Sequence, residues 1–147
     1  DLHRLDRRQR QMCIRDSLFD AIMGAREVQA ENLAKKLMSY NLPIVIVGKA
    51  YKPHVPYTNG SYSLLIGHYI EKAGRTLYYK DEHTGDTPPK TLGTAVYLLA
   101  HNPKVTYGTD DNAKYDFPKG SIIVDPWRQC PQIKDCTVVE YGNTRNL

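Results

Sequence analysis

The residues of this chain that could do chemistry follow two short apolar segments. Lys49 and Lys52 come after the first segment, residues 44–48, and Arg128 comes after the second, residues 121–125. Ammonium and guanidinium groups hold phosphate by charge-assisted hydrogen bonds, and a guanidinium can make two such bonds in parallel. The pattern therefore favours binding of a phosphate-bearing ligand, although lysines solvated on an ordinary loop would produce the same sequence.

The elements that must position these side chains are a strand, a loop, a helix and a second strand. Residues 44–48 form a continuous apolar run, which is typical of a strand covered on both faces. Apolar residues recur at helical spacing over residues 62–73, Ser61 can cap this helix, and Gly74 suits its carboxyl end. A right-handed crossover makes residues 76–80 a parallel neighbour of the first strand. The intervening loop then lies at the carboxyl edge of the sheet, where open α/β sheets bind ligands.

The glycine content of this loop argues against a dinucleotide. A dinucleotide loop carries G-x-G-x-x-G, whose glycines let the backbone approach a pyrophosphate. Of these glycines the chain has only Gly48, and it offers Lys49 and Lys52 instead. We therefore expect a phosphate to be held by an ammonium as well as by backbone amides, including those at the start of the helix near Gly60 and Ser61.

Four segments, in order and spacing, resemble the C-terminal, UDP-binding domain of the UDP-glucose/GDP-mannose dehydrogenase family. The family's pattern of G-x-A-[FY]-K-P, a helix-starting serine and a Y-D-P ending resembles GKAYKP, Ser61 and YYKDE here. Residues 95–103 resemble the next strand of that domain, and residues 121–128 resemble its last strand with the Asp-x-x-Arg ending. The resemblance runs from the helix before Pro43 to about Asn146, which is most of the chain.

The resemblance implies an α/β, Rossmann-like three-layer domain with a mostly parallel sheet, preceded by a linker helix. It implies a cytoplasmic, UDP-glucose 6-dehydrogenase-like enzyme of polysaccharide biosynthesis, which oxidises the C6 alcohol of a UDP-sugar to a carboxylate with NAD and forms a homodimer. The substrate-binding residues would be Tyr51, Lys52, Gly60, Ser61 and Arg128. We assign no catalytic, cofactor-binding or metal-binding residue in this chain.

Several departures limit what the resemblance implies. Asn59 stands where the family has an arginine, and Gln29 stands where its preceding helix has an asparagine. The family's catalytic cysteine segment and its N-terminal glycine-fingerprint domain, which binds NAD, do not occur in this sequence. We therefore expect a substrate-binding module that is inactive alone. The segment 83–94 is rich in proline and glycine, so a loop is expected there instead of a crossover helix.

Three parts are expected along the chain: residues 1–17 as a non-native or disordered tail, residues 18–41 as a linker and dimerisation helix, and residues 42–147 as the UDP-sugar-binding domain. The tail contains RRQRQMCIRDS, which resembles translated adapter sequence, and an intact genomic reading frame through it would exclude that origin. Ser17 and Asp20 form a capping-box start for the helix. A helix packed on the sheet explains its periodicity equally well.

Length and composition suit one domain, with 147 residues of which 41% are apolar and 24% charged. The net charge is +4, and residues 1–16 contain five arginines against three aspartates. The chain lacks the aromatic interleaving and the recognition helix of nucleic-acid readers, so we expect no nucleic-acid partner. No apolar run approaches the length of a bilayer span, so we expect no membrane partner.

The remaining candidates stay open. Cys130 and Cys136 have neither zinc-site spacing nor a histidine base close in sequence, and Cys13 lies in the tail. His101 could face the ligand edge or be solvated, and Trp127 could cover a base or pack in an interface. Asp125 could orient Arg128 or form a structural salt bridge with it.

Two other functions fit the sequence. A non-catalytic α/β interaction module would use a tyrosine-rich surface, such as Tyr107 and Tyr115, for protein contact. Another NAD-binding Rossmann-type enzyme domain would prefer a dinucleotide, which the single glycine argues against.

Overall fold

The computed structural model describes residues 2–107 and 115–142, with side chains described from Ser17 onward. Within these residues, five strands form one sheet in the order β2-β1-β3-β4-β5, and each neighbouring pair is parallel. The strands are β1 (Ile44–Val47), β2 (Leu77–Lys80), β3 (Val96–Leu99), β4 (Ile122–Asp125) and β5 (Thr137–Glu140). The helices are α1 (Leu2–Met38), α2 (Tyr62–Lys72) and α3 (Pro103–Tyr107). The expected Rossmann-like α/β fold with a preceding helix is confirmed.

Strand β1 lies between β2 and β3, and all four of its side chains are buried. Ile44 pairs with Leu77 of β2 on one side and with Val96 of β3 on the other. The chain leaves β1 toward β2 and later returns to the opposite side of β1 at β3. The carboxyl end of β1 is therefore the point where the strand order reverses, which is where open α/β sheets bind ligands.

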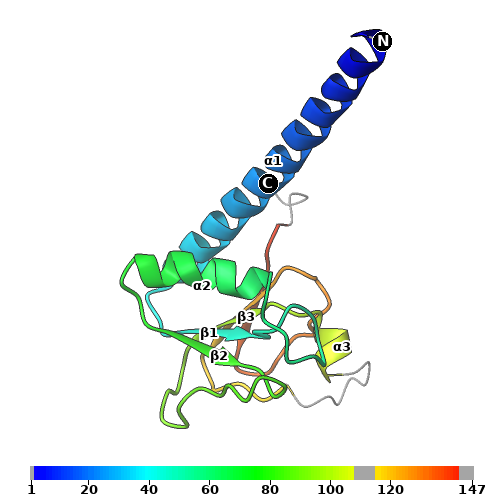
Figure 1. Ribbon diagram of the computed structural model, residues 1–147. Helices are drawn as coiled ribbons and strands as arrows, with labels where there is room; N and C mark the ends of the chain where they lie inside the picture. The colour runs from blue at the N-terminus through cyan, green and yellow to red at the C-terminus, as the bar shows by residue number, and fades with distance from the viewer. Residues whose placement is uncertain (1, 108–114, 143–147) are drawn as a thin grey trace.

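Helices α1 and α2 cover one face of the sheet (Figure 1). Ile44 and Ile46 point into this face and pack in a cluster with side chains from both helices, among them Leu37 of α1 and Ile70 of α2. All four side chains are fully buried, and each such burial contributes about 1.5–3 kcal/mol. This packing fixes α2 above β1 and so fixes the loop that joins them.

The opposite face of the sheet is covered by loops in the described part of the chain. Val45 and Tyr97 pack there against loop side chains such as Phe117, whose ring meets that of Tyr97 at a centroid distance of 4.8 Å. Residues 83–94 contain no helix, which confirms the expected loop. The third layer of the domain is therefore built from loop segments.

Helix α1 begins at Leu2, so the helix start predicted at Ser17 is wrong. Residues 2–23 contain no proline or glycine and are rich in arginine, glutamine and leucine, which are strong helix formers, so nothing in the sequence stops the helix before Ser17. The amino-terminal part of α1 projects away from the sheet (Figure 1). Whether residues 1–17 are native stays a hypothesis.

Some sequence features lie outside the described residues. These are residue 1, the side chain of Cys13 and the end of the family-like segment beyond residue 142. Among the described residues, no helix combines the length and the apolar character that a membrane crossing needs.

Candidate functional site

The loop between β1 and α2 turns sharply at its first residue. Gly48 has φ 101°, a backbone conformation that residues with a side chain rarely adopt. A Cβ atom at this position would lie 2.6 Å from the His101 imidazole, which follows β3. The ring Nε2 of His101 is 3.0 Å from the Ala50 carbonyl oxygen. Glycine is therefore needed for His101 to lie over the end of β1 and contact the loop, and His101 faces the carboxyl edge of the sheet.

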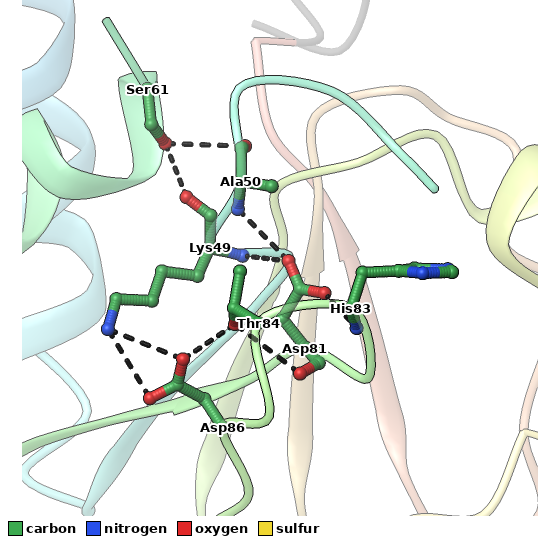
Figure 2. Close-up of polar contacts among 7 residues, drawn as sticks. All are labelled: Lys49, Ala50, Ser61, Asp81, His83, Thr84 and Asp86. Carbon is green, nitrogen blue, oxygen red and sulfur yellow. Dashed lines mark hydrogen bonds and ion pairs between the residues drawn. The ribbon is translucent and has the colours of Figure 1, made fainter. Parts of the chain in front are cut away.

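The Asp81 carboxylate, just after β2, closes this loop (Figure 2). The backbone N–H groups of Lys49 and Ala50 donate to its Oδ2 at 2.9 and 3.0 Å, and the N–H of His83 donates to its Oδ1 at 2.9 Å. Burial raises the pKa of Asp81, but the hydrogen bonds from Ala50, His83 and Lys49 outweigh it and lower that pKa below its ordinary value. The loop N–H groups that we expected to face a ligand thus donate to an ionised carboxylate of the chain itself.

The Lys49 ammonium is paired within the chain (Figure 2). Its Nζ lies 3.3 Å from each oxygen of the Asp86 carboxylate and 5.0 Å from the centroid of the Tyr79 ring. Thr84 Oγ1 also donates to Asp86, at 2.6 Å, and Asp81 and Asp86 exchange two backbone hydrogen bonds of 2.9 and 3.0 Å. Lys49 is therefore not a free cation that could hold a phosphate.

Ser61 holds the loop in place. Its side chain is buried, and its Oγ donates to the carbonyl oxygens of Lys49 and Ala50 at 2.6 and 3.3 Å (Figure 2). Ser61 occupies the N-cap position of α2 but makes no side-chain capping hydrogen bond, so the predicted cap is wrong. Its backbone N–H donates to Thr58 at 3.0 Å, so Ser61 positions the loop instead of offering a free donor.

Tyr51, Lys52 and Gly60 are exposed on the same loop. A Cβ atom added at Gly60 would lie 3.7 Å from the Tyr51 ring, an ordinary van der Waals distance. The Gly60 carbonyl accepts a 2.6 Å hydrogen bond from the guanidinium of Arg26, which reaches across from α1 and lies 5.6 Å from the centroid of the Tyr62 ring. Arg26 thus brings a cation to the start of α2.

The contact between Arg26 and Gly60 was not predicted from the sequence, because it depends on how α1 crosses α2. The position of Arg26 on a helix was predictable, and one signal was available: this residue lies one turn before Ala30, which is fully buried against the sheet. The sequence does not give the crossing direction, so it could not show that the Arg26 side chain reaches the start of α2.

Arg128 follows β4 at the same carboxyl edge as Lys52, as expected, since β1 and β4 run in the same direction. Arg128 is exposed, has a left-handed backbone with φ 57°, and donates from its guanidinium to the Gly142 carbonyl. This contact holds the guanidinium near the end of β5.

Asp125 forms no ion pair with Arg128 in the described structure, so the predicted salt bridge is wrong. Its fully buried carboxylate accepts the backbone N–H groups of Trp127, Gln129 and Cys130 at 2.9, 2.8 and 2.8 Å. A carboxylate at the end of a buried strand is satisfied most directly by the turn that follows it. Asp125 therefore shapes the turn that carries Trp127 and Arg128.

Among the described residues, a cleft opens at the carboxyl edge on each face of the sheet. The helix-face cleft, of about 400 Å³, is lined by side chains of both helices and of the loop after β4. The loop-face cleft, of about 350 Å³, is lined by residues after β1, β2 and β3. None of the five predicted site residues lines either cleft, but Pro53, Tyr62 and Trp127, each a chain neighbour of one of them, do.

The helix-face cleft combines aromatic rings with side-chain amides. Tyr62 and Trp127 line it together with Gln29 and Asn32 of α1. The indole N–H of Trp127 donates to the Leu99 carbonyl at 3.1 Å, which fixes the ring although it is 47% exposed. The Tyr62 phenol can donate a hydrogen bond, and burial raises its pKa above the ordinary value. Aromatic faces stack on bases and amides hydrogen-bond to base edges, so this cleft suits a nucleobase.

The loop-face cleft carries three imidazoles, those of His54, His83 and His101. Nδ1 of His54 is 3.3 Å from Nε2 of His83, and His54 has a left-handed backbone with φ 63°. Among the described residues, no group of three or more histidine, cysteine or acidic side chains could hold a metal ion. The cleft therefore offers polar ring nitrogens without a metal site.

Tyr107 lines the loop-face cleft and packs against Tyr115, with ring centroids 4.6 Å apart. Both rings are half-buried, and burial raises the pKa of Tyr107 to about 12. This packing accounts for both side chains within the domain. Part of each ring stays exposed, and a role of these tyrosines in protein contact stays a prediction.

The two described cysteines, Cys130 and Cys136, are free and half-buried. Burial, with a smaller effect from the Asp125 carboxylate, raises the pKa of Cys130 to about 12. Because the thiolate is the reactive form of cysteine, Cys130 is unsuited to a nucleophilic role.

Comparison of the chain with protein-family models, with curated proteins and with solved structures finds no match.

Proposed function

We propose that this chain is the nucleotide-sugar-binding domain of a cytoplasmic UDP-glucose 6-dehydrogenase-like enzyme. The observation that carries the proposal is the helix-face cleft at the carboxyl edge of the sheet. It combines the rings of Tyr62 and Trp127 with the amides of Gln29 and Asn32, and Arg26 lies over Tyr62. The rings can stack on a base, the amides can hydrogen-bond to the edge of that base, and Arg26 can bind a phosphate. These groups lie in one region of the carboxyl edge.

In this proposal the uracil enters the helix-face cleft and the phosphates lie along the cations around it. Arg26 is held at the start of α2, where the helix dipole also favours an anion. Arg128 would exchange its contact with the Gly142 carbonyl for a stronger, charge-assisted contact with phosphate. Lys52, exposed on the loop after β1, would meet the outer phosphate or the sugar.

The chain would bind the substrate without performing the oxidation. In the intact enzyme, NAD would accept hydride as the C6 alcohol is converted to a carboxylate, and it would be bound by a separate domain. The turn after β1 does not fit the diphosphate of NAD, because Asp81 already holds the N–H groups of Lys49 and Ala50. We therefore expect no turnover from this chain alone.

Calorimetric titration with UDP tests the proposal. A charge-assisted contact contributes about 1.5–3 kcal/mol, so Arg26→Ala, Lys52→Ala and Arg128→Ala should each weaken binding by roughly ten-fold or more. Lys119→Ala removes the same charge just before β4, at the amino edge of the sheet, and should leave the affinity unchanged. Unchanged UDP affinity in all three edge variants would refute the assignment.

A second candidate, a non-catalytic interaction module, is favoured by one observation. Leu18, Phe19 and Ile22 on α1 are each more than half exposed. In the proposed enzyme these side chains would pack in a homodimer, whereas an interaction module would use them for another protein. A thermal-shift panel of UDP, UDP-glucose, GDP-mannose and NAD separates the candidates, because a ligand that binds only the folded state raises its stability. The interaction module would respond to none of the four.

A further inference from the structure

We propose that Asp81 is a built-in anion that fills the phosphate position of the turn after β1 and so excludes phosphate and dinucleotides from that turn. In nucleotide-binding α/β folds, the backbone N–H groups of this turn receive the ligand's phosphate. Here the N–H groups of Lys49 and Ala50 point at one oxygen of the Asp81 carboxylate, at 2.9 and 3.0 Å. The turn has the geometry of an anion site, and its occupant comes from the chain itself.

The occupant is firmly held. The second oxygen of Asp81 accepts the N–H of His83 at 2.9 Å, and the side chain is only 8% exposed. The backbone of Asp81 is anchored by two reciprocal hydrogen bonds with Asp86. An entering phosphate would have to displace this carboxylate or share the same donors with it, and two anions at one site repel each other.

The turn itself is also fixed in the shape that receives Asp81. Ser61 holds the carbonyls of Lys49 and Ala50 from behind, so both N–H groups stay directed at the carboxylate (Figure 2). The Lys49 ammonium, which could otherwise attract a phosphate, is neutralised by Asp86 at 3.3 Å. Two carboxylates from the loop after β2 thus engage both groups that could bind a phosphate here. Asp81 accepts the N–H groups of the turn, and Asp86 pairs with the Lys49 ammonium.

Asp81 is therefore a specificity determinant that acts by occupying a site. It would prevent the domain from binding the diphosphate of a dinucleotide at the turn after β1. Anionic ligands would then bind to exposed side chains of the neighbouring loops. This inference does not depend on UDP binding, because it concerns only the turn and its own carboxylate.

Anion rescue of an Asp81 variant tests the inference. We would measure the melting temperature of the wild-type chain, Asp81→Ala, Asp81→Asn and Glu82→Ala in 100 mM chloride, formate or phosphate. Glu82→Ala is the matched control, since it removes the same charge from the adjacent, exposed residue, whose side chain makes no hydrogen bond to the turn in the described structure. Comparison with wild type in the same salt removes general salt effects on stability.

We expect Asp81→Ala to melt below wild type in chloride, and formate or phosphate to raise its melting temperature by about 3–6 °C more than that of wild type or Glu82→Ala. Asp81→Asn still fills the position and should show no such extra gain. Equal gains in all four proteins would overturn the inference. An Asp81→Ala chain that stays unfolded in every salt would also overturn it. So would a rise in the melting temperature of Asp81→Asn, beyond that of wild type, as large as the rise for Asp81→Ala.

Discussion

Gly67→Ala is the substitution that tests most directly how α2 sits on the sheet. Gly67 is buried in the middle of α2 and lies against β2. A Cβ atom there would overlap the hydroxyl of Tyr79 and lie 2.9 Å from Cδ2 of Leu77, closer than real Cβ atoms approach their neighbours. Glycine at this position therefore allows the close approach of helix and strand.

Two opposing effects set the magnitude. Alanine improves helix propensity over glycine by about 1 kcal/mol. Overpacking costs about 1–3 kcal/mol, and the upper part of that range applies where the neighbours cannot move aside. The Tyr79 ring is confined, because it is half-buried and Lys49 lies over it at 5.0 Å. We expect a net destabilisation of about 1 kcal/mol, which would lower the melting temperature by about 2–6 °C.

Urea unfolding followed by circular dichroism measures this difference, and a double-mutant cycle locates its cause. Tyr79→Phe removes the hydroxyl that the new methyl group would meet, so combining it with Gly67→Ala should recover at least 0.5 kcal/mol relative to additive effects, roughly the threshold for coupled residues. Gly24→Ala is the matched control: it lies in α1 with no atom within 4 Å of the added Cβ, and should be neutral or stabilising.

The reasoning would be refuted if Gly67→Ala were at least as stable as the wild-type chain. Strict additivity of Gly67→Ala and Tyr79→Phe would also contradict it, because the overlap would then lie elsewhere.

Two further predictions follow from shifted pKa values. The folded pKa of Asp81 is lowered, so its contribution to stability is complete above the unfolded value of about 3.9 and is lost as pH falls through the lower, folded value. In urea unfolding below about pH 4, the free energy of unfolding of the wild-type chain should fall more steeply than that of Asp81→Asn; parallel curves would contradict this. Burial raises the pKa of Cys130 to about 12, so iodoacetamide at pH 8 should modify Cys130 much more slowly in the folded chain than in urea, as measured by peptide mass spectrometry.

Most strands of the sheet were predictable from local sequence, but β5, with partly exposed side chains, follows the strand that we expected to be the last and was missed. Strands β1, β3 and β4 are short apolar runs, and their burial on both faces explains why the sequence shows no alternation. The spacing of apolar residues in α2 reports the face that packs on the sheet. In these elements, each residue's own type carries the information about its environment.

The pairing of the charges was not predictable. Lys80 pairs in register with Val47, which places Asp81 level with the turn at Gly48 and within reach of the amides of Lys49. That register results from packing between segments more than thirty residues apart. The sequence shows two lysines and two aspartates near strand ends, but only the register decides that Lys49 meets Asp86 while Lys52 stays exposed.

The all-parallel strand order also determines how this domain must fold. Every neighbouring pair of strands joins distant segments, and even the nearest paired residues, Ile122 and Thr137, are 15 positions apart. No strand pair can therefore form as a local hairpin. The chain must lose the entropy of closing long loops before strand pairing can stabilise it. Such non-local topologies fold in milliseconds to seconds, and the apolar strands β1 and β3 stay open to association with other chains during that time.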